Sequence, residues 1–168
     1  MSDSLARAEP VTEAPFDVQG FALAFAPPMS RYSLRARDLA ALEAMLGVNV
    51  PAKIGQFEGE VACLGPDEWL LRSLTQRKLI PPAGIPMSIV DVSERSICLI
   101  AEGARASEVL NSGCPLDLAR FASGRATRTI FETVEIILFR EAEARFQVEV
   151  WRSFAPWLWA ALKAAATG

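Results

Sequence analysis

The C-terminal half of the chain contains three strand-like segments that follow one another with only short turns between them. Residues 128–131, 133–139 and 145–151 are rich in β-branched and aromatic side chains, and no helix-length segment separates them. Parallel neighbours need a crossover connection of a dozen or more residues, so this succession favours antiparallel pairing over a doubly wound parallel sheet. It predicts an α+β fold, with antiparallel or mixed sheets and helices packed on them.

The two halves of the chain show the same order of expected elements. In each half a strand is followed by a helix that ends at a glycine, and then by further strands. The expected segments are strand 29–35, helix 38–47, strands 57–63 and 68–72, then strands 87–92 and 95–101, helix 104–113 and the three strands above. We interpret this order as a weak internal repeat within one domain, residues 29–168. Residues 1–28 are proline-rich and lack sustained periodicity, so we expect a flexible or partner-bound N-terminal arm.

Composition argues against two classes of partner. The net charge is -3 and the pI is about 5.1, so the chain has no basic field for a phosphate backbone, and we expect no nucleic-acid partner. No apolar run approaches the roughly 20 residues that span a bilayer, and we expect no membrane partner. These features predict a cytoplasmic protein.

The usual residues of a catalytic or metal site are missing from the sequence. The chain has no histidine, the commonest general base and metal ligand, and none of its ten glycines stands in a Gly-x-Gly pair. Its cysteines are widely spaced: Cys63 and Cys98 fall in apolar strands, where we expect them to be buried, and Cys114 falls at a turn. We therefore predict no catalytic, cofactor-binding or metal-binding residue on this chain.

Three of the four tryptophans, Trp151, Trp157 and Trp159, lie close together near the C-terminus. Side chains alternate between the two faces of a strand, so Trp151 is expected on the polar face of the last strand with Gln147 and Glu149. A tryptophan on a polar face contacts either another layer of the same chain or a different chain.

The segment after the last strand is expected to form a helix with Ser153 as its N-cap. Its expected apolar stripe consists of Phe154, Leu158, Ala161, Leu162 and Ala165. At about 100° per residue, Trp157 lies at the flank of this stripe and Trp159 lies on the far side, beside Lys163.

Two interpretations of the tryptophans remain open at this stage. Either the N-terminal arm covers Trp151 and Trp159, or these two side chains anchor a large protein interface, with Arg152 as a charged neighbour. Arg128 and Arg152 likewise have two interpretations. Each forms an ion pair within the chain, or each offers a planar donor to a carboxylate on a partner subunit.

Five motifs in the chain resemble a known family. They are Leu-Gly-Pro-Asp-Glu-Trp-Leu-Leu at 64–71, Val-Asp-Val-Ser-Glu-Arg at 90–95, Asn-Ser-Gly-Cys-Pro-Leu-Asp-Leu at 111–118, Arg-Ala-Thr-Arg-Thr at 125–129 and Trp-Arg-Ser-Phe-Ala at 151–155. In this order they resemble the gamma subunits of heterotetrameric sarcosine oxidase, and the match extends over roughly residues 57–162.

The resemblance implies a fold related to the folate-binding domain of glycine-cleavage aminomethyltransferases. It also implies an assembly with alpha, beta and delta subunits that oxidatively demethylates sarcosine to glycine, transfers the one-carbon unit to tetrahydrofolate or releases formaldehyde, and forms hydrogen peroxide. In this family FAD, FMN, NAD, tetrahydrofolate and zinc belong to other subunits, and the gamma chain is structural. The chain is therefore expected to be inactive in isolation.

Two alternatives stay open beside the structural subunit. The chain could be a stand-alone folate or one-carbon-binding domain, since the implied fold is that of a folate-binding domain, although fold alone does not carry function. It could instead be a relative that associates with copies of itself through the same tryptophan surface.

Overall fold

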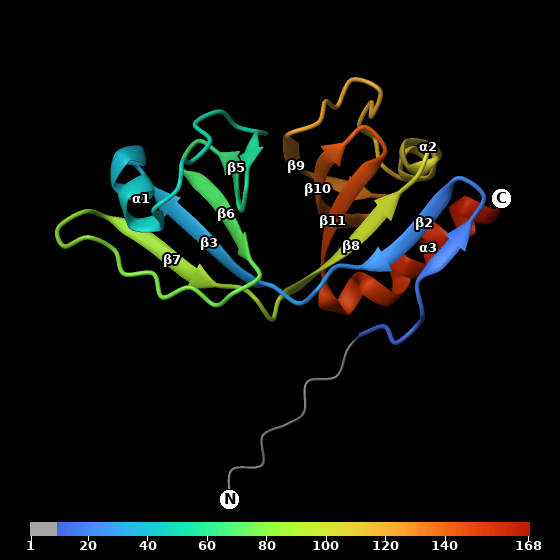
Figure 1. The fold of residues 1–168 in the computed structure, drawn as a ribbon, viewed down its shortest axis with the longest axis horizontal. Helices are drawn as coiled ribbons and strands as arrows, with labels where there is room; N and C mark the ends of the chain where they lie inside the picture. The colour runs from blue at the N-terminus through green and yellow to red at the C-terminus, as the bar shows by residue number, and fades with distance from the viewer. Residues whose placement is uncertain (1–9) are drawn as a thin grey trace, which may run out of the picture.

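Two antiparallel sheets form the centre of the molecule, and the helices lie on their outward faces (Figure 1). The computed structural model describes residues 10–168. The first sheet has the spatial order β4 (Phe57–Glu58), β5 (Val61–Gly65), β6 (Glu68–Ser73), β3 (Ser30–Ala36) and β7 (Met87–Asp91). The second has the order β1 (Phe16–Val18), β2 (Phe21–Phe25), β8 (Ser96–Glu102), β11 (Arg145–Trp151), β10 (Val134–Ala142) and β9 (Arg125–Phe131). This arrangement confirms the predicted α+β fold.

Each sheet shares an apolar core with its own helices. The helices are α1 (Leu39–Leu46), α2 (Ala106–Asn111), the 3-10 helix η1 (Arg152–Phe154) and α3 (Ala155–Thr167). Helix α1 packs on the first sheet through Leu42 and Leu46, and α2 and α3 pack on the second sheet. The Asp38 carboxylate accepts a hydrogen bond from the Ala41 amide at 3.0 Å. As the sequence predicts, the helix ends at a glycine, since Gly47 ends α1 in the left-handed conformation.

The spatial order of the strands shows that the two sheets repeat the same topology. Strands β4-β5-β6-β3-β7 of the first sheet correspond to β9-β10-β11-β8-β2 of the second, and α1 and α2 follow the equivalent strands β3 and β8. One position differs in its origin. The partner at the outer edge of β3 is β7, which comes later in the chain, whereas the equivalent partner of β8 is β2, from the N-terminal segment.

The expectation of a flexible or partner-bound arm over residues 1–28 is wrong for residues 16–25, which form β1 and β2. Residues 1–9 of that expectation lie outside the described part of the chain. After β11 the chain continues into α3, so the second half supplies no further strand for the open edge of β8. Pairing with β2 satisfies the backbone groups along that edge. The sequence pattern did not predict β1 and β2 because these strands are short and lie among prolines.

The first turn after β11 differs from the expected geometry. Ser153 lies inside η1, and the N-cap of α3 is Phe154, which makes no side-chain capping hydrogen bond. The buried residues of α3 are Ala155, Leu158, Trp159, Leu162 and Ala166. At about 100° per residue, this stripe is rotated by roughly 70° from the expected one. The reason is that Phe154, used to set the expected stripe, belongs to the 3-10 turn and is exposed.

The inward faces of the two sheets pack against each other. Small and aromatic side chains fill this layer, with Ala62 and Leu70 from the first sheet and Ala126 and Phe139 from the second. Arg31 lies on this face of β3 and is only 3% exposed, although the alternation of the strand predicts a half-exposed position. The second sheet covers the face that the sequence assigns to solvent.

Candidate functional site

A buried ion group joins the two sheets. Arg31 on β3 donates a hydrogen bond from Nε to Glu149 Oε2 on β11 at 2.7 Å, and Arg72 Nη1 on β6 lies 3.4 Å from Glu149 Oε1. The side chains of all three residues are at most 8% exposed. One carboxylate thus lies between two guanidinium groups, and the group links the first sheet to the second.

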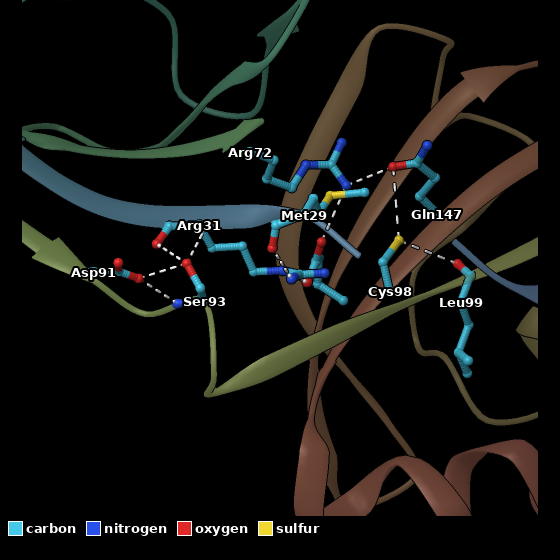
Figure 2. Close-up of polar contacts among 9 residues, drawn as sticks. Met29, Arg31, Arg72, Asp91, Ser93, Cys98, Leu99 and Gln147 are labelled. Carbon is cyan, nitrogen blue, oxygen red and sulfur yellow. Dashed lines mark hydrogen bonds and ion pairs between the residues drawn. The ribbon is translucent and has the colours of Figure 1, made fainter. Parts of the chain in front are cut away.

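Neighbouring groups satisfy more of the guanidinium hydrogens. Arg31 Nη1 donates to the Met29 carbonyl at 2.9 Å, and Arg72 Nη1 donates to Gln147 Oε1 at 2.6 Å, as Figure 2 shows. The Arg72 guanidinium also lies 3.5 Å from the centre of the Phe139 ring. A charged group that is paired and hydrogen-bonded on several sides can remain buried without the full desolvation cost.

Sequence reasoning missed this ion group. It placed Gln147 and Glu149 on the polar face of their strand, which is correct, but the face lies against the other sheet and Glu149 is 3% exposed. The available signal was an arginine in each of β3 and β6 together with a glutamate in β11. Alternation identifies two faces of a strand, and it does not identify what covers each face.

A cavity of about 240 Å³ lies between the sheets beside this ion group. Its lining includes Arg31, Glu68, Arg95, Arg128, Glu149 and Trp151. Two of the residues that the sequence singled out, Arg128 and Trp151, therefore lie on one cavity. Seven of the sixteen lining residues are charged, so the cavity suits polar or ionic groups better than an apolar ligand.

Arg128 forms ion pairs within the chain. Its Nη2 donates to Glu68 Oε1 at 2.7 Å, and its Nε lies 3.8 Å from Glu135 Oε1. The hydrogen bond from Arg128 is the main reason why the pKa of Glu68 lies below its usual value. Burial opposes this effect, and the fields of Arg128, Arg35 and Arg95 add to it. The intramolecular alternative is therefore realised for Arg128.

Three aromatic side chains are exposed around the end of β11 and the start of α3. Trp151 is 41% exposed, Phe154 44% and Trp157 38%, and we call these three residues the aromatic surface. The Trp151 and Phe154 rings are 6.3 Å apart, and Trp157 contacts the buried Phe131 ring edge-on at 6.3 Å. Large exposed rings in one region are typical of surfaces that bind another protein.

Trp159 does not belong to the aromatic surface. Its side chain is 1% exposed and lies in the core of the second sheet, so the prediction that it points away from the core is wrong. The Phe25 ring of β2 stacks on it with centres 4.8 Å apart. The N-terminal strands and the rotated stripe of α3 together explain this burial, and Trp159 has no surface to offer a partner.

Arg152 follows Trp151 directly and lies at the start of η1, partly buried. Its backbone amide donates a hydrogen bond to the Arg95 carbonyl at 3.0 Å. Trp151 is also paired with Ser96 in the sheet. The structure thus brings Trp151 and Arg152 next to Arg95, a residue that sequence reasoning did not single out.

The Val-Asp-Val-Ser-Glu-Arg motif at 90–95 contains a turn. The Ser93 amide and hydroxyl donate to Asp91 Oδ1 at 2.9 and 2.6 Å, and these bonds hold the pKa of Asp91 below its usual value. Cys63 and Cys98 are buried in strands as expected, and Cys114 is buried as well. Burial raises the pKa of the Cys63 and Cys98 thiols, which makes them unreactive.

Two structural features of residues 10–168 bear on the class of site. Within these residues, no cluster of three or more cysteine, aspartate or glutamate side chains is placed to hold a metal ion. None of the helices in this part of the chain has the length and apolar character needed to cross a membrane.

Comparison with known proteins matches the chain to one family. The family model described as "Sarcosine oxidase, gamma subunit family" matches residues 35–168, which is most of the chain. The chain belongs to the sarcosine oxidase gamma subunit family. This finding confirms the resemblance seen in the sequence motifs.

Two relatives in the gamma subunit family have similar levels of identity. The sarcosine oxidase subunit gamma of Corynebacterium sp. (strain U-96) is 32% identical over 121 residues, which are 65% of this chain and 59% of the relative. The sarcosine oxidase subunit gamma of Arthrobacter sp. is 31% identical over 121 residues, or 65% of this chain and 60% of the relative. The chain thus spans about three fifths of the length of the curated relatives it matches.

Solved structures support the same assignment. A chain of the heterotetrameric sarcosine oxidase from Corynebacterium sp. U-96 in complex with pyrrole 2-carboxylate matches with a TM-score of 0.81 and 29% identity, covering 88% of this chain and 84% of that chain. The glycine cleavage system aminomethyltransferase T from Bartonella henselae matches with a TM-score of 0.59 and 14% identity, covering 85% of this chain and 45% of that chain. The second match shows that the gamma-family chain shares the aminomethyltransferase fold.

Proposed function

We propose that this chain is the non-catalytic structural subunit of a heterotetrameric sarcosine oxidase. The assembly oxidatively demethylates sarcosine to glycine, with one-carbon transfer to tetrahydrofolate or release of formaldehyde and with formation of hydrogen peroxide. The chain contributes by burying the aromatic surface against the alpha, beta or delta subunits. FAD, FMN, NAD, tetrahydrofolate and zinc are carried by those subunits, and the isolated chain is inactive.

The observation that supports this proposal is the exposure of three aromatic side chains, Trp151, Phe154 and Trp157, around the end of β11 and the start of α3. Tryptophan is among the residue types that contribute most to protein interfaces. Membership of the gamma subunit family and the match to a heterotetrameric enzyme point to larger subunits as the partners of this surface.

The proposal is tested by reconstituting the assembly from the other subunits and this chain. Trp151→Ala and Trp157→Ala should each weaken association by about 2 kcal/mol or more, roughly 30-fold in Kd. Both side chains are substantially exposed, so the melting temperature of the isolated chain should change little. Ile80→Ala is the control, because Ile80 is 66% exposed and lies in the loop after β6, away from the aromatic surface.

Three results would contradict the proposal. One is steady peroxide formation from sarcosine and oxygen by the purified chain without other subunits. Another is retention of wild-type affinity by both tryptophan variants. If either variant instead dissociates an oligomer of the isolated chain, the surface joins copies of this chain and the structural-subunit role is wrong.

A further inference from the structure

The charged side chains that line the inter-sheet cavity do not balance. The lining contains four arginines and three glutamates. Among these residues, Arg31 forms an ion pair with Glu149, Arg35 with Glu68, and Arg128 with both Glu68 and Glu135. Each glutamate is therefore engaged by an arginine, and Arg95 is the lining arginine left over.

Arg95 lines the cavity and forms no ion pair with a carboxylate of residues 10–168. It lies in the turn between β7 and β8, where its amide donates to the Val92 carbonyl at 3.0 Å and its carbonyl accepts from the Arg152 amide at 3.0 Å. Within residues 10–168, no carboxylate lies within ion-pair distance of its guanidinium, which is exposed. The backbone bonds fix where this cation is presented.

The guanidinium of Arg95 lies over the Trp151 ring, 4.6 Å from its centre. A stacked guanidinium keeps its N–H donors in the plane of the group, where they remain free to bind a carboxylate with two parallel hydrogen bonds. Stacking also reduces the rotamer freedom that a partner would otherwise have to restrict. The aromatic surface thus contains one preoriented cation beside exposed rings.

We infer that Arg95, stacked on Trp151, receives the carboxylate of an aspartate or glutamate on a partner subunit, and that apolar side chains flanking this residue pack on the aromatic surface. The inference rests on the proposed function, since it names the chemistry of the partner at that surface. Arg128, which the sequence suggested for such a role, is already engaged by two glutamates of its own chain. Charge complementarity selects Arg95 instead.

The experiment measures the Kd between this chain and the remaining co-expressed subunits of the assembly, at low and at high salt. Arg95→Glu should weaken binding about 30-fold or more, because it places two carboxylates against each other at a partly buried pair. Arg95→Lys should lie between wild type and Arg95→Glu, because an ammonium keeps the charge and lacks the fork of donors. The control is Arg120→Glu, which makes the same charge change at another exposed position.

The expected result also includes a weaker salt dependence in Arg95→Ala than in wild type, with an unchanged melting temperature of the isolated chain. If Trp151→Ala and Trp157→Ala weaken assembly and Arg95→Glu matches Arg120→Glu, the carboxylate inference is wrong and the proposed function stands. If neither tryptophan variant weakens assembly, both the proposed function and this inference are wrong.

Two other sources of the carboxylate that binds Arg95 can be distinguished with Arg95→Glu and one shortened variant. If Arg95→Glu changes the sedimentation of the isolated chain, the carboxylate comes from a second copy and the inference is overturned. A variant lacking residues 1–9, which include Asp3 and Glu9, should keep the effect of Arg95→Glu. Loss of that effect would assign the carboxylate to the chain itself and would overturn the inference too.

Discussion

Replacement of Glu149 by glutamine tests the role of the buried ion group between the sheets. Glu149→Gln removes the only carboxylate of the group and leaves Arg31 and Arg72 buried with no opposite charge between them. At an effective dielectric constant of about 20, the attraction at separations of 2.7 and 3.4 Å is about 5 to 6 kcal/mol per pair, before the cost of desolvation is subtracted. Each arginine keeps one other acceptor, the Met29 carbonyl and Gln147 Oε1, and glutamine itself can still accept one hydrogen bond.

These terms place the loss in the free energy of unfolding at about 3 kcal/mol, the low end of the range for breaking a buried pair. For a chain of this length the melting temperature should fall by about 6 to 12 °C. The assay is urea unfolding of the isolated chain, monitored by tryptophan fluorescence, together with a thermal melt. Because the group joins the sheets, both sheets should lose stability in Glu149→Gln.

The matched control is Glu135→Gln on β10. The Glu135 side chain is 50% exposed and lies 3.8 Å from Arg128, so its loss should cost no more than about 1 kcal/mol. Arg31→Met combined with Glu149→Gln should cost less than the two single changes added together, because both singles break one pair. If Glu149→Gln loses less than about 1 kcal/mol, or no more than Glu135→Gln, the ion group does not hold the sheets together.

Trp159→Ala should lower the free energy of unfolding by about 3 to 5 kcal/mol, because the Trp159 ring fills the core under Phe25. Trp157→Ala should lower it by about 1 kcal/mol or less, because Trp157 is partly exposed. Equal losses for the two variants in urea unfolding would contradict the burial of Trp159. Glu68 concerns pH. Its pKa is lowered from 4.5 in the folded state, so the stabilisation from its pair with Arg128 is full above about pH 4.5 and is lost as the pH falls through the folded value. The stability advantage of wild type over Glu68→Gln should therefore shrink on acidification from pH 7 to 3.5, and a constant difference in urea unfolding would refute the assignment.

Local patterns predict much of the framework of this chain. The end of the first helix at Gly47 and the pair of strands on either side of the 65–67 turn appear where the sequence places them. These features depend on interactions among residues close in the chain, such as capping hydrogen bonds and turn conformations. The order of strands and helices also predicts the α+β class and the internal repeat.

The candidate site is less predictable, because its members come from distant parts of the chain. Alternation identifies Trp151 as lying on the face opposite the outer core, and the structure agrees with that assignment. The same rule places Glu149 on the same face of β11. Glu149 is buried between the sheets, whereas Trp151 is exposed. Arg95 ends the family motif at 90–95, but no periodicity assigns it to a surface, because it is a single arginine in a turn.

By itself the sequence determined the succession of strands, the positions of the first two helices and the family motifs, since each of these is encoded by neighbouring residues. Only the tertiary structure decided that β2 pairs with β8, that Trp159 is covered by Phe25, and that Arg31, Arg72 and Glu149 meet between the sheets. The physical reason is that side-chain periodicity specifies which faces an element has. What lies against each face depends on how segments far apart in the chain pack together, as the second sheet lies against the arginine face of β3.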